Sequence, residues 1–263
     1  MSAAEPERSA GAGGAARGTA VQRHIQRYLG ELSQSAEAEA CKAAFARELA
    51  QLKQQPEYAL LDTDVSVELV EPNIDRTSYT LVTHGVSRRP LNVPPALLKA
   101  NPESLRYVEL VICLPYDWPL TAEALTEQEH VWPLQLLARV AQYPHARGTW
   151  IAEGHTLGGD IDHAEAYAPN TQLCCAVVSP LFEVDEGFRR LKAQAGQRDS
   201  EGGYVPGKSV NFIGLIPIYA EEMRVAVERG GAELLDLLET CGVTEELDLA
   251  RKCAVRKKRF WFF

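Results

Sequence analysis

The chain has 263 residues, of which 46% are hydrophobic and 24% charged. This length and composition are typical of a globular protein that buries a substantial core in one large domain or two modest ones. The net charge of −9 and the pI near 5.3 argue against general nucleic-acid binding, which needs clustered Lys and Arg to contact phosphates. An acidic surface favours a basic partner instead.

The cysteine pattern and the N-terminus indicate a reduced, cytoplasmic protein. The six cysteines form no CxxC or CxxH pair, so we expect no structural zinc site. Cys113 and the adjacent Cys174 and Cys175 lie in apolar runs, where a reduced cysteine behaves as a small hydrophobic residue. Glu5 and Glu7 with no apolar segment nearby do not fit a secretory signal. No stretch reaches the roughly 18 apolar residues of a membrane span.

The N-terminal part of the chain predicts a tail followed by helices. Residues 1–20 are mostly Ala and Gly and have too few large apolar side chains to order themselves, so we expect a disordered tail. Within 21–54, apolar residues recur at helical spacing from Val21 to Leu29 and again from Cys41 to Leu52. Two helices are therefore predicted here.

The hydrophobic period then changes to that of strands. Val65 to Leu69 alternates apolar and polar residues, and Tyr79 to Thr83 is β-branched and aromatic. The turn residues 71–73 lie between these runs, so a hairpin or a pair of neighbouring strands is predicted. The proline-rich run 88–95 predicts an ordered loop.

Residues 106–155 are predicted to form one packing unit. Tyr107 to Leu114 is an apolar run typical of a buried strand. An amphipathic helix follows from about Glu129 to Tyr143. Thr149 then begins a second predicted strand, which continues into His155.

The remaining chain predicts two strands, a loop and two short helices. Leu173 to Val178 and Val210 to Tyr219 are the strands, and Pro217 indicates an edge strand or a strand end. Residues 192–208 predict an exposed, mobile loop. The closing helices are expected over 221–229 and 232–239. Because strands do not alternate regularly with helices, we predict a single α+β domain with a mixed or mostly antiparallel sheet flanked by helices.

Several of these segments, in this order, resemble the suppressor-of-fused (SUFU) family. The segments are RRPLNVPP (88–95), YVELVICLPYDWP (107–119), WPLQLLARVAQYPHARGTWIAEGHTL (132–157), APNTQL (168–173), VNFIGLIPIYAEEM (210–223) and GAELLDLLE (231–239). The resemblance covers about residues 55–240 and forms an ordered, specific set. It leaves 241–263, which is basic and then aromatic, as a C-terminal tail.

The resemblance implies a non-enzymatic protein-binding domain without a cofactor. Animal members of the family sequester Gli transcription factors in the cytosol and capture an extended peptide between two lobes, partly by strand pairing. Bacterial members are mostly single-domain immunity proteins that neutralise cognate polymorphic toxins. Only about twenty residues follow the last predicted helix, so we expect the second lobe to be missing. This departure favours an immunity protein that blocks a toxin by steric occlusion; a regulator or scaffold that binds a peptide or a transcription factor is the alternative.

Five residues are predicted to contact a protein partner. Tyr143, His145, Trp150 and Asp160 flank the predicted helix-to-strand turn and the loop after it, where a peptide strand can add to a sheet edge. His155 lies between them. Trp150 fits a place in the core equally well, and His155 also fits a hydrogen-bonded turn.

A metal site is the third hypothesis. Glu153, His155, Asp160, Asp162 and His163 carry the side chains that hold divalent ions in metal-dependent hydrolases. Their spacing matches no defined ligand motif, so we expect neither a metal nor a catalytic residue. No GxSxG elbow and no phosphate-binding loop with its Lys-Ser/Thr ending is present.

Two further segments have more than one interpretation. Residues 116–119 (YDWP) fit an aromatic docking corner, but packing of Trp118 at the end of the core is the favoured interpretation. Six of the residues 251–259 are Lys or Arg, which fits either a solvated basic tail or a weak, salt-sensitive contact with an anionic membrane or nucleic acid.

Overall fold

A computed structural model of the protein describes residues 18–59, 64–98, 105–192 and 209–255. Residues 1–17 of the predicted tail, nearly all of the predicted mobile loop and the terminal RKKRFWFF lie outside the described residues. No helix in the described ranges is long and apolar enough to cross a membrane.

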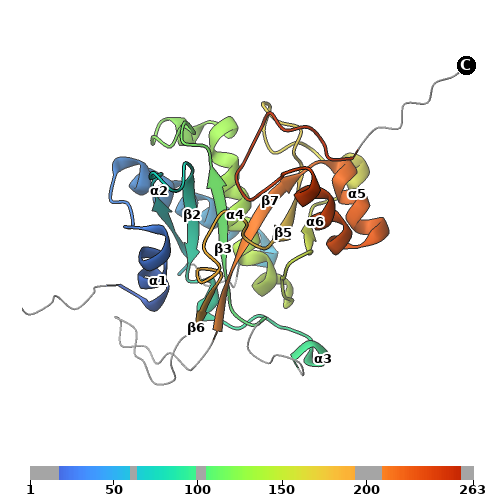
Figure 1. The fold of residues 1–263 in the computed structure, drawn as a ribbon, viewed down its shortest axis with the longest axis horizontal. Coiled ribbons are helices and arrows are strands. Elements are labelled where there is room, and N and C mark those ends of the chain that lie inside the picture. The colour runs from blue at the N-terminus through green and yellow to red at the C-terminus, as the bar shows by residue number, and fades with distance from the viewer. Residues whose placement is uncertain (1–17, 60–63, 99–104, 193–208, 256–263) are drawn as a thin grey trace, which may run out of the picture.

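Seven strands in the described part of the chain form one sheet (Figure 1). They are β1 (Ser66–Val70), β2 (Tyr79–His84), β3 (Val108–Leu114), β4 (Thr156–Leu157), β5 (Cys175–Ser179), β6 (Arg190–Lys192) and β7 (Ser209–Ile218). The order is β1-β2-β3-β7-β5-β4, and β6 also pairs with β7. The β3–β7 pair is parallel, and the other strand pairs are antiparallel. The predicted mixed, mostly antiparallel sheet and the α+β class are confirmed.

Helices cover both faces of this sheet. They are α1 (Ala20–Leu29), α2 (Ala36–Leu52), α3 (Pro95–Leu98), α4 (Gln128–Arg147), α5 (Ala220–Arg229) and α6 (Gly231–Thr240). The first two begin at side-chain caps, because Thr19 accepts the Gln22 N–H and Ser35 accepts the Ala38 N–H. The two predicted N-terminal helices and the two closing helices are confirmed.

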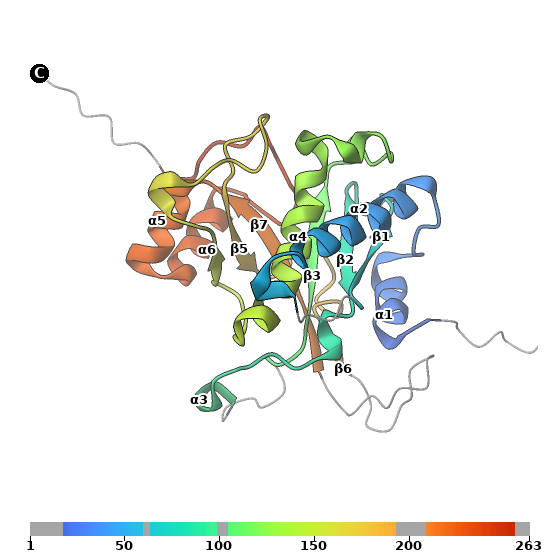
Figure 2. The same ribbon diagram turned by 180° about the vertical axis from the view of Figure 1, so that it is seen from behind.

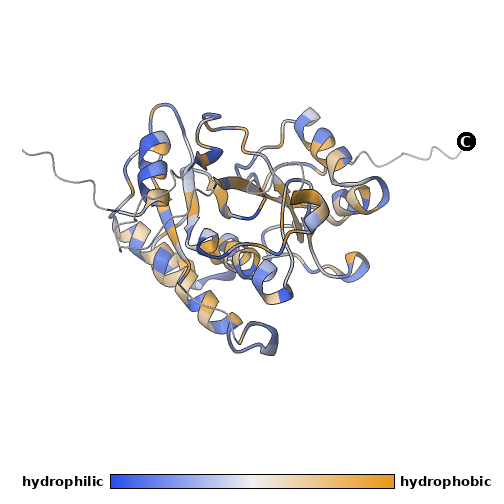
Figure 3. Cartoon of the chain, turned by 90° about the horizontal axis from the view of Figure 1, so that it is seen from below, coloured by the Kyte–Doolittle hydropathy of each residue, from blue (hydrophilic) through white to orange (hydrophobic). Residues whose placement is uncertain are grey.

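Burial on both faces explains why β3 is almost continuously apolar. Leu110, Ile112 and Leu114 pack on the side of α2 and α4, whereas Val111 and Cys113 pack on the side of α1. Figure 2 shows α2 and α4 side by side over one face of the sheet. Figure 3 shows apolar residues gathered on the central strands and hydrophilic ones on the outward sides of the helices.

The sheet divides at Gly214 in β7. A Cβ atom there would lie 2.7 Å from the Ser179 hydroxyl oxygen and 3.2 Å from a Leu181 methyl carbon, so a larger residue would have to displace these side chains. Beyond it, β7 leaves β3 and its residues Ile216 and Ile218 pack under α5 and α6. Pro217 is therefore near the end of an internal strand, opposite Ala176, and not in an edge strand.

The described part of the predicted C-terminal tail, residues 241–255, packs against the sheet. The Cys113 N–H donates to the Glu245 carbonyl (3.2 Å), and the Leu247 N–H donates to the Cys113 carbonyl (2.9 Å). The fully buried Glu245 carboxylate accepts the N–H of Phe182 at 2.8 Å. This segment therefore pairs with the part of β3 that β7 has left.

The strand predicted from Thr149 to His155 is wrong. The preceding helix α4 continues to Arg147 and ends at Gly148, whose φ of 58° starts a turn. Gly154, with a φ of 83°, turns the chain again. Pairing with the sheet begins at this turn, where Gly154 donates to the Val178 carbonyl of β5 (2.8 Å) and His155 accepts the Val178 N–H (2.8 Å), and it continues in β4. Local β propensity around Trp150 was outweighed by these two turns.

Candidate functional site

A cavity of about 300 Å³ lies between α4 and the edge strand β4. It is lined by aromatic, apolar and glycine residues together with one arginine, one threonine and one cysteine. These residues are Tyr58, Leu136, Arg139, Val140, Tyr143, Thr156, Leu157, Gly158, Gly159, Tyr167 and Cys174. The lining residues come from segments that are far apart in the sequence. A polar rim around an apolar cavity is typical of a pocket that takes a side chain.

Three tyrosines and an arginine give this cavity its hydrogen-bonding character. Burial raises the pKa of Tyr58 and of Tyr167, so both phenols remain protonated donors at neutral pH. Tyr167 is held by stacking on Trp132, with ring centroids 5.1 Å apart. The exposed Arg139 forms no hydrogen bond or ion pair with the described residues. The cavity therefore presents donors to an incoming acceptor group.

The edge of β4 is open beside the cavity. Among the described strands, β4 pairs only with β5, through Thr156 opposite Val177 and Leu157 opposite Ala176. An unpaired strand edge exposes backbone N–H and C=O groups that an extended segment can pair with. Gly159 follows at the rim, and a side chain added there would meet no atom within 4 Å.

The predicted partner residues fall into three places. Tyr143 lines the cavity with 37% of its surface exposed, and Asp160 follows the rim glycine, where it accepts the Asp162 N–H. Trp150 and His155 form an edge-on pair with ring centroids 4.3 Å apart, and Trp150 packs against the main core. His145 lies in the last turn of α4.

The titratable side chains among the predicted partner residues differ in charge at neutral pH. Burial lowers the pKa of His145, as does the nearby Arg89, and burial lowers the pKa of His155. Both rings are therefore mainly neutral at pH 7. A hydrogen bond from the His163 ring (2.8 Å) lowers the pKa of Asp160, which keeps that exposed carboxylate charged. Asp160 is thus the anionic member of the set.

The residues of the metal hypothesis are not gathered into a ligand set. Asp160 pairs with His163, Asp162 pairs with Arg224, and the His155 ring packs on Trp150. In the part of the chain that the structure describes, no group of three or more His, Cys, Asp or Glu side chains is arranged to hold a metal ion.

Trp118 belongs to the core, as its favoured interpretation predicts. Only 8% of its surface is exposed, its Nε1 donates to the His130 carbonyl (3.1 Å), and it packs edge-on against Trp132. The neighbouring Tyr116 is 70% exposed.

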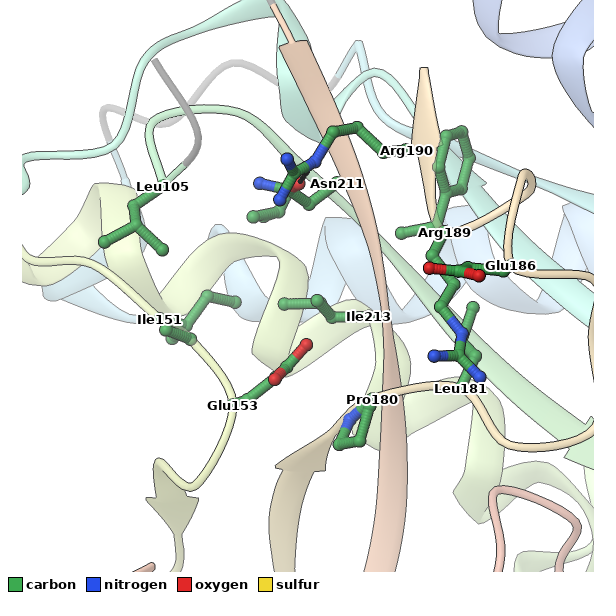
Figure 4. Close-up of a pocket in the computed structure, with 13 residues that line it drawn as sticks. Leu105, Ile151, Glu153, Pro180, Leu181, Glu186, Arg189, Arg190, Asn211 and Ile213 are labelled. Carbon is green, nitrogen blue, oxygen red and sulfur yellow. Dashed lines mark hydrogen bonds between the residues drawn. The ribbon is translucent and has the colours of Figure 1, made fainter. Parts of the chain in front are cut away.

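A second cavity, of about 480 Å³, is lined in part by residues 151–153, which follow Trp150 (Figure 4). Its apolar part is built by Leu105, Val108, Ile151, Phe212 and Ile213, and its charged part by Glu153, Glu186, Arg189 and Arg190. Of the charged residues, the sequence singled out Glu153 only as part of the metal hypothesis. It gave no signal for Glu186, Arg189 and Arg190, or for Tyr58, Arg139 and Tyr167 of the first cavity. Isolated polar residues in loops and on helix surfaces are ordinary in any soluble protein.

Comparison with known proteins places the chain in a family. Residues 62–252 match the family model described as suppressor of fused protein (SUFU). No curated protein matches the sequence.

The solved structures that are similar to this chain include the following three. A chain of the Sufu–Fu complex is 16% identical with a TM-score of 0.43, and the match covers 81% of this chain and 91% of that one. A SUFU homologue from Neisseria gonorrhoeae is 15% identical (TM-score 0.45; 82% and 97% covered). Drosophila Suppressor of Fused is 16% identical (TM-score 0.46; 81% and 50% covered). Because the family model matches well over half of its length, this chain belongs to the SUFU family.

Proposed function

We propose that the protein is a non-enzymatic binding domain that accepts an extended segment of a protein partner along β4. The observation that carries the proposal is the open edge of β4 next to a cavity lined by tyrosines and Arg139. Backbone pairing supplies affinity in this binding mode, and a side chain placed in the cavity supplies specificity. Tyr143 and Asp160 are the contact residues at the cavity and its rim, and the Trp150–His155 pair extends the surface.

The biological role that we propose is that of an immunity protein, which neutralises a cognate toxin by occupying its surface. The charge of −9 supports this role, because a strongly acidic protein associates quickly with a basic toxin domain. The mechanism involves no chemistry and no cofactor. Association driven in this way is expected to slow as ionic strength rises.

The binding site is tested with a matched pair of bulky substitutions. Gly159→Trp adds a large side chain at the cavity rim, where the structure has open space, so folding should be retained. Val227→Trp adds the same side chain on α5, at a residue that is 66% exposed and does not line the cavity. Capture of the partner from native lysate should be lost with Gly159→Trp and retained with Val227→Trp. Equal capture by both variants contradicts the proposed site.

The immunity role has its own test. Cells that express the toxin domain encoded beside this protein should survive when the wild-type chain is co-expressed, and should die with Gly159→Trp. A wild-type chain that neither binds this toxin nor protects the cells refutes the immunity role and leaves the binding site open.

The second candidate function is a regulator or scaffold that binds a short peptide. The two-residue length of β4 and the cavity of about 300 Å³ favour it, because they match a short segment with one anchoring side chain. A synthetic peptide from the captured partner decides between the two. Full affinity in the isolated peptide supports the regulator, and a need for the folded partner supports the immunity protein.

A further inference from the structure

The cavity between α4 and β4 carries charge of one sign. Its lining contains Arg139, and none of the described Asp or Glu side chains lines it. Burial raises the pKa of Tyr58 and of Tyr167, and the positive charge of Arg139 acts on both phenols in the opposite direction. The guanidinium is therefore close enough to both phenols to act on the same bound group. Without a neighbouring carboxylate, this charge favours an anion in the cavity.

Two phenol hydroxyls add donors beside the cation. Tyr58 is 6% exposed, and neither its hydroxyl nor that of Tyr167 has a hydrogen-bond partner among the described residues. A phenol can either donate or accept, so the charge of Arg139 decides that the complementary group is an acceptor. A carboxylate is such a group, because its two oxygens can accept from a guanidinium and from phenols at the same time.

The position of β4 determines how a side chain would enter. Leu157 of β4 packs against the main core, on the side of the sheet that α4 covers. In a strand added beside β4, the residue opposite Leu157 points to this same side, and the residues next to it point to the other side. The buried Leu136 and Val140 of α4 also line the cavity, so they offer apolar surface to the methylene groups of the entering side chain.

We propose that the segment paired with β4 places an acidic side chain in this cavity, where Arg139, Tyr58 and Tyr167 bind its carboxylate. The inference rests on the function proposed above and names the chemistry of the anchoring residue. Arginine suits this role because its planar fork can donate to both oxygens of a carboxylate. The net charge of −9 attracts a basic partner over a longer range, whereas this cavity selects one acid at contact distance.

Blocked pentapeptides are the probes. Acetyl-Thr-Val-Glu-Val-Thr-amide places its glutamate at the centre of a palindromic sequence, so the order of side chains is the same for either strand direction. Titration into the ¹⁵N-labelled protein should shift the amide signals of Leu157, Gly158, Gly159 and Tyr167. Replacing the glutamate by glutamine should weaken binding at least about threefold, as expected for a partly exposed ion pair. Equal affinity for the two peptides, or no shift with the glutamate peptide, overturns the proposal.

Matched variants identify the groups that bind the acid. Arg139→Gln should weaken binding of the glutamate peptide at least about threefold and leave the affinity for the glutamine peptide unchanged. Arg229→Gln removes the same charge from the exposed end of α5, outside the cavity, and should change neither affinity.

The phenol has its own variant. Tyr167→Phe keeps the ring that stacks on Trp132 and removes the hydroxyl, so it should also weaken binding of the glutamate peptide. Thermal unfolding shows whether each variant retains the fold. Unchanged affinity for the glutamate peptide in a folded Arg139→Gln or a folded Tyr167→Phe overturns the proposal.

Failure of this inference is distinguishable from failure of the proposed function. If Gly159→Trp abolishes partner capture while the glutamate and glutamine peptides bind equally, the acid inference is wrong and the β4 site stands. If the wild-type chain prefers the glutamate peptide and Arg139→Gln does not, the cavity selects an acid. Should Gly159→Trp still capture the partner in that case, the partner binds elsewhere, and the function proposed for β4 is wrong.

Discussion

The Arg251 guanidinium and the fully buried Glu222 carboxylate form a two-pronged ion pair, with both N···O distances at 2.7 Å. Glu222 also accepts the N–H of Tyr219 (2.9 Å) and that of Ala254 (2.7 Å). The pair therefore ties α5 to the C-terminal segment that lies along β3.

Breaking this pair should destabilise the whole domain. Arg251→Met leaves a buried carboxylate without its cation, and we expect a loss of about 3–5 kcal/mol in the free energy of unfolding, measured by urea denaturation. Arg224→Met breaks the exposed pair with Asp162 and should cost less than about 1 kcal/mol. Similar losses in the free energy of unfolding of the two variants would show that the buried ion pair stabilises the fold no more than the exposed one does.

Glu109 is the second buried carboxylate that we expect to stabilise the fold. It has no exposed surface and accepts the hydroxyls of Thr83 (2.7 Å) and Ser87 (2.6 Å) and the N–H groups of Gly85 and Ser87. Glu109→Gln turns an amide donor toward these donors, and we expect a loss of about 1–3 kcal/mol. An unchanged urea midpoint would contradict this assignment.

Gly231 packs closely against Gly154, so adding a side chain at Gly231 should destabilise the fold. A Cβ atom on Gly231 would lie 1.8 Å from the Gly154 carbonyl oxygen, so Gly231→Ala must displace α6 or the turn before β4. We expect a loss of about 1–3 kcal/mol, as for other overpacked sites, measured by thermal unfolding. Gly159→Ala, which meets no atom within 4 Å, is the control and should unfold near the wild-type temperature.

His24 should make stability depend on pH. It packs against the rings of Phe188 and Phe212, and its Nε2 forms a hydrogen bond with the Phe188 carbonyl oxygen at 2.9 Å. Burial, with a smaller contribution from Arg27, lowers the pKa of His24 below its ordinary 6.5. Below pH 6.5 the unfolded chain therefore binds the proton more strongly than the folded chain does, and stability falls as pH falls.

The measurement is the urea midpoint between pH 7.5 and 5. The contribution of His24 is complete above its unfolded pKa and is lost as pH falls toward its folded pKa, by at most about 1.4 kcal/mol per pH unit. His145 and His155 contribute with the same sign, since their pKa values are also lowered. His24→Phe should therefore show a shallower pH dependence than the wild-type chain. If the urea midpoints of the two proteins change with pH in parallel, His24 does not contribute to the pH dependence of stability.

The sequence by itself determined most of the helices and long strands and the class of fold. Helical spacing in α1 and α2, the apolar run of β3 and the glycines between α5 and α6 act over a few residues, so they can be recognised locally. The near-absence of polar residues in β3 also reflects burial on both faces. The family resemblance depended on the order of such segments.

Only the tertiary structure decided where the chain bends and which residues meet. Gly148 and Gly154 ended the extension expected around Trp150, and residues 245–247 of the predicted tail paired with Cys113 of β3. Tyr58 and Tyr167 share a cavity although they are far apart in the sequence, and Arg189 lines the second cavity. Contacts between residues that are far apart in the sequence depend on long-range strand pairing and packing. The hydrophobic period and the secondary-structure propensity of a single segment do not reveal these interactions.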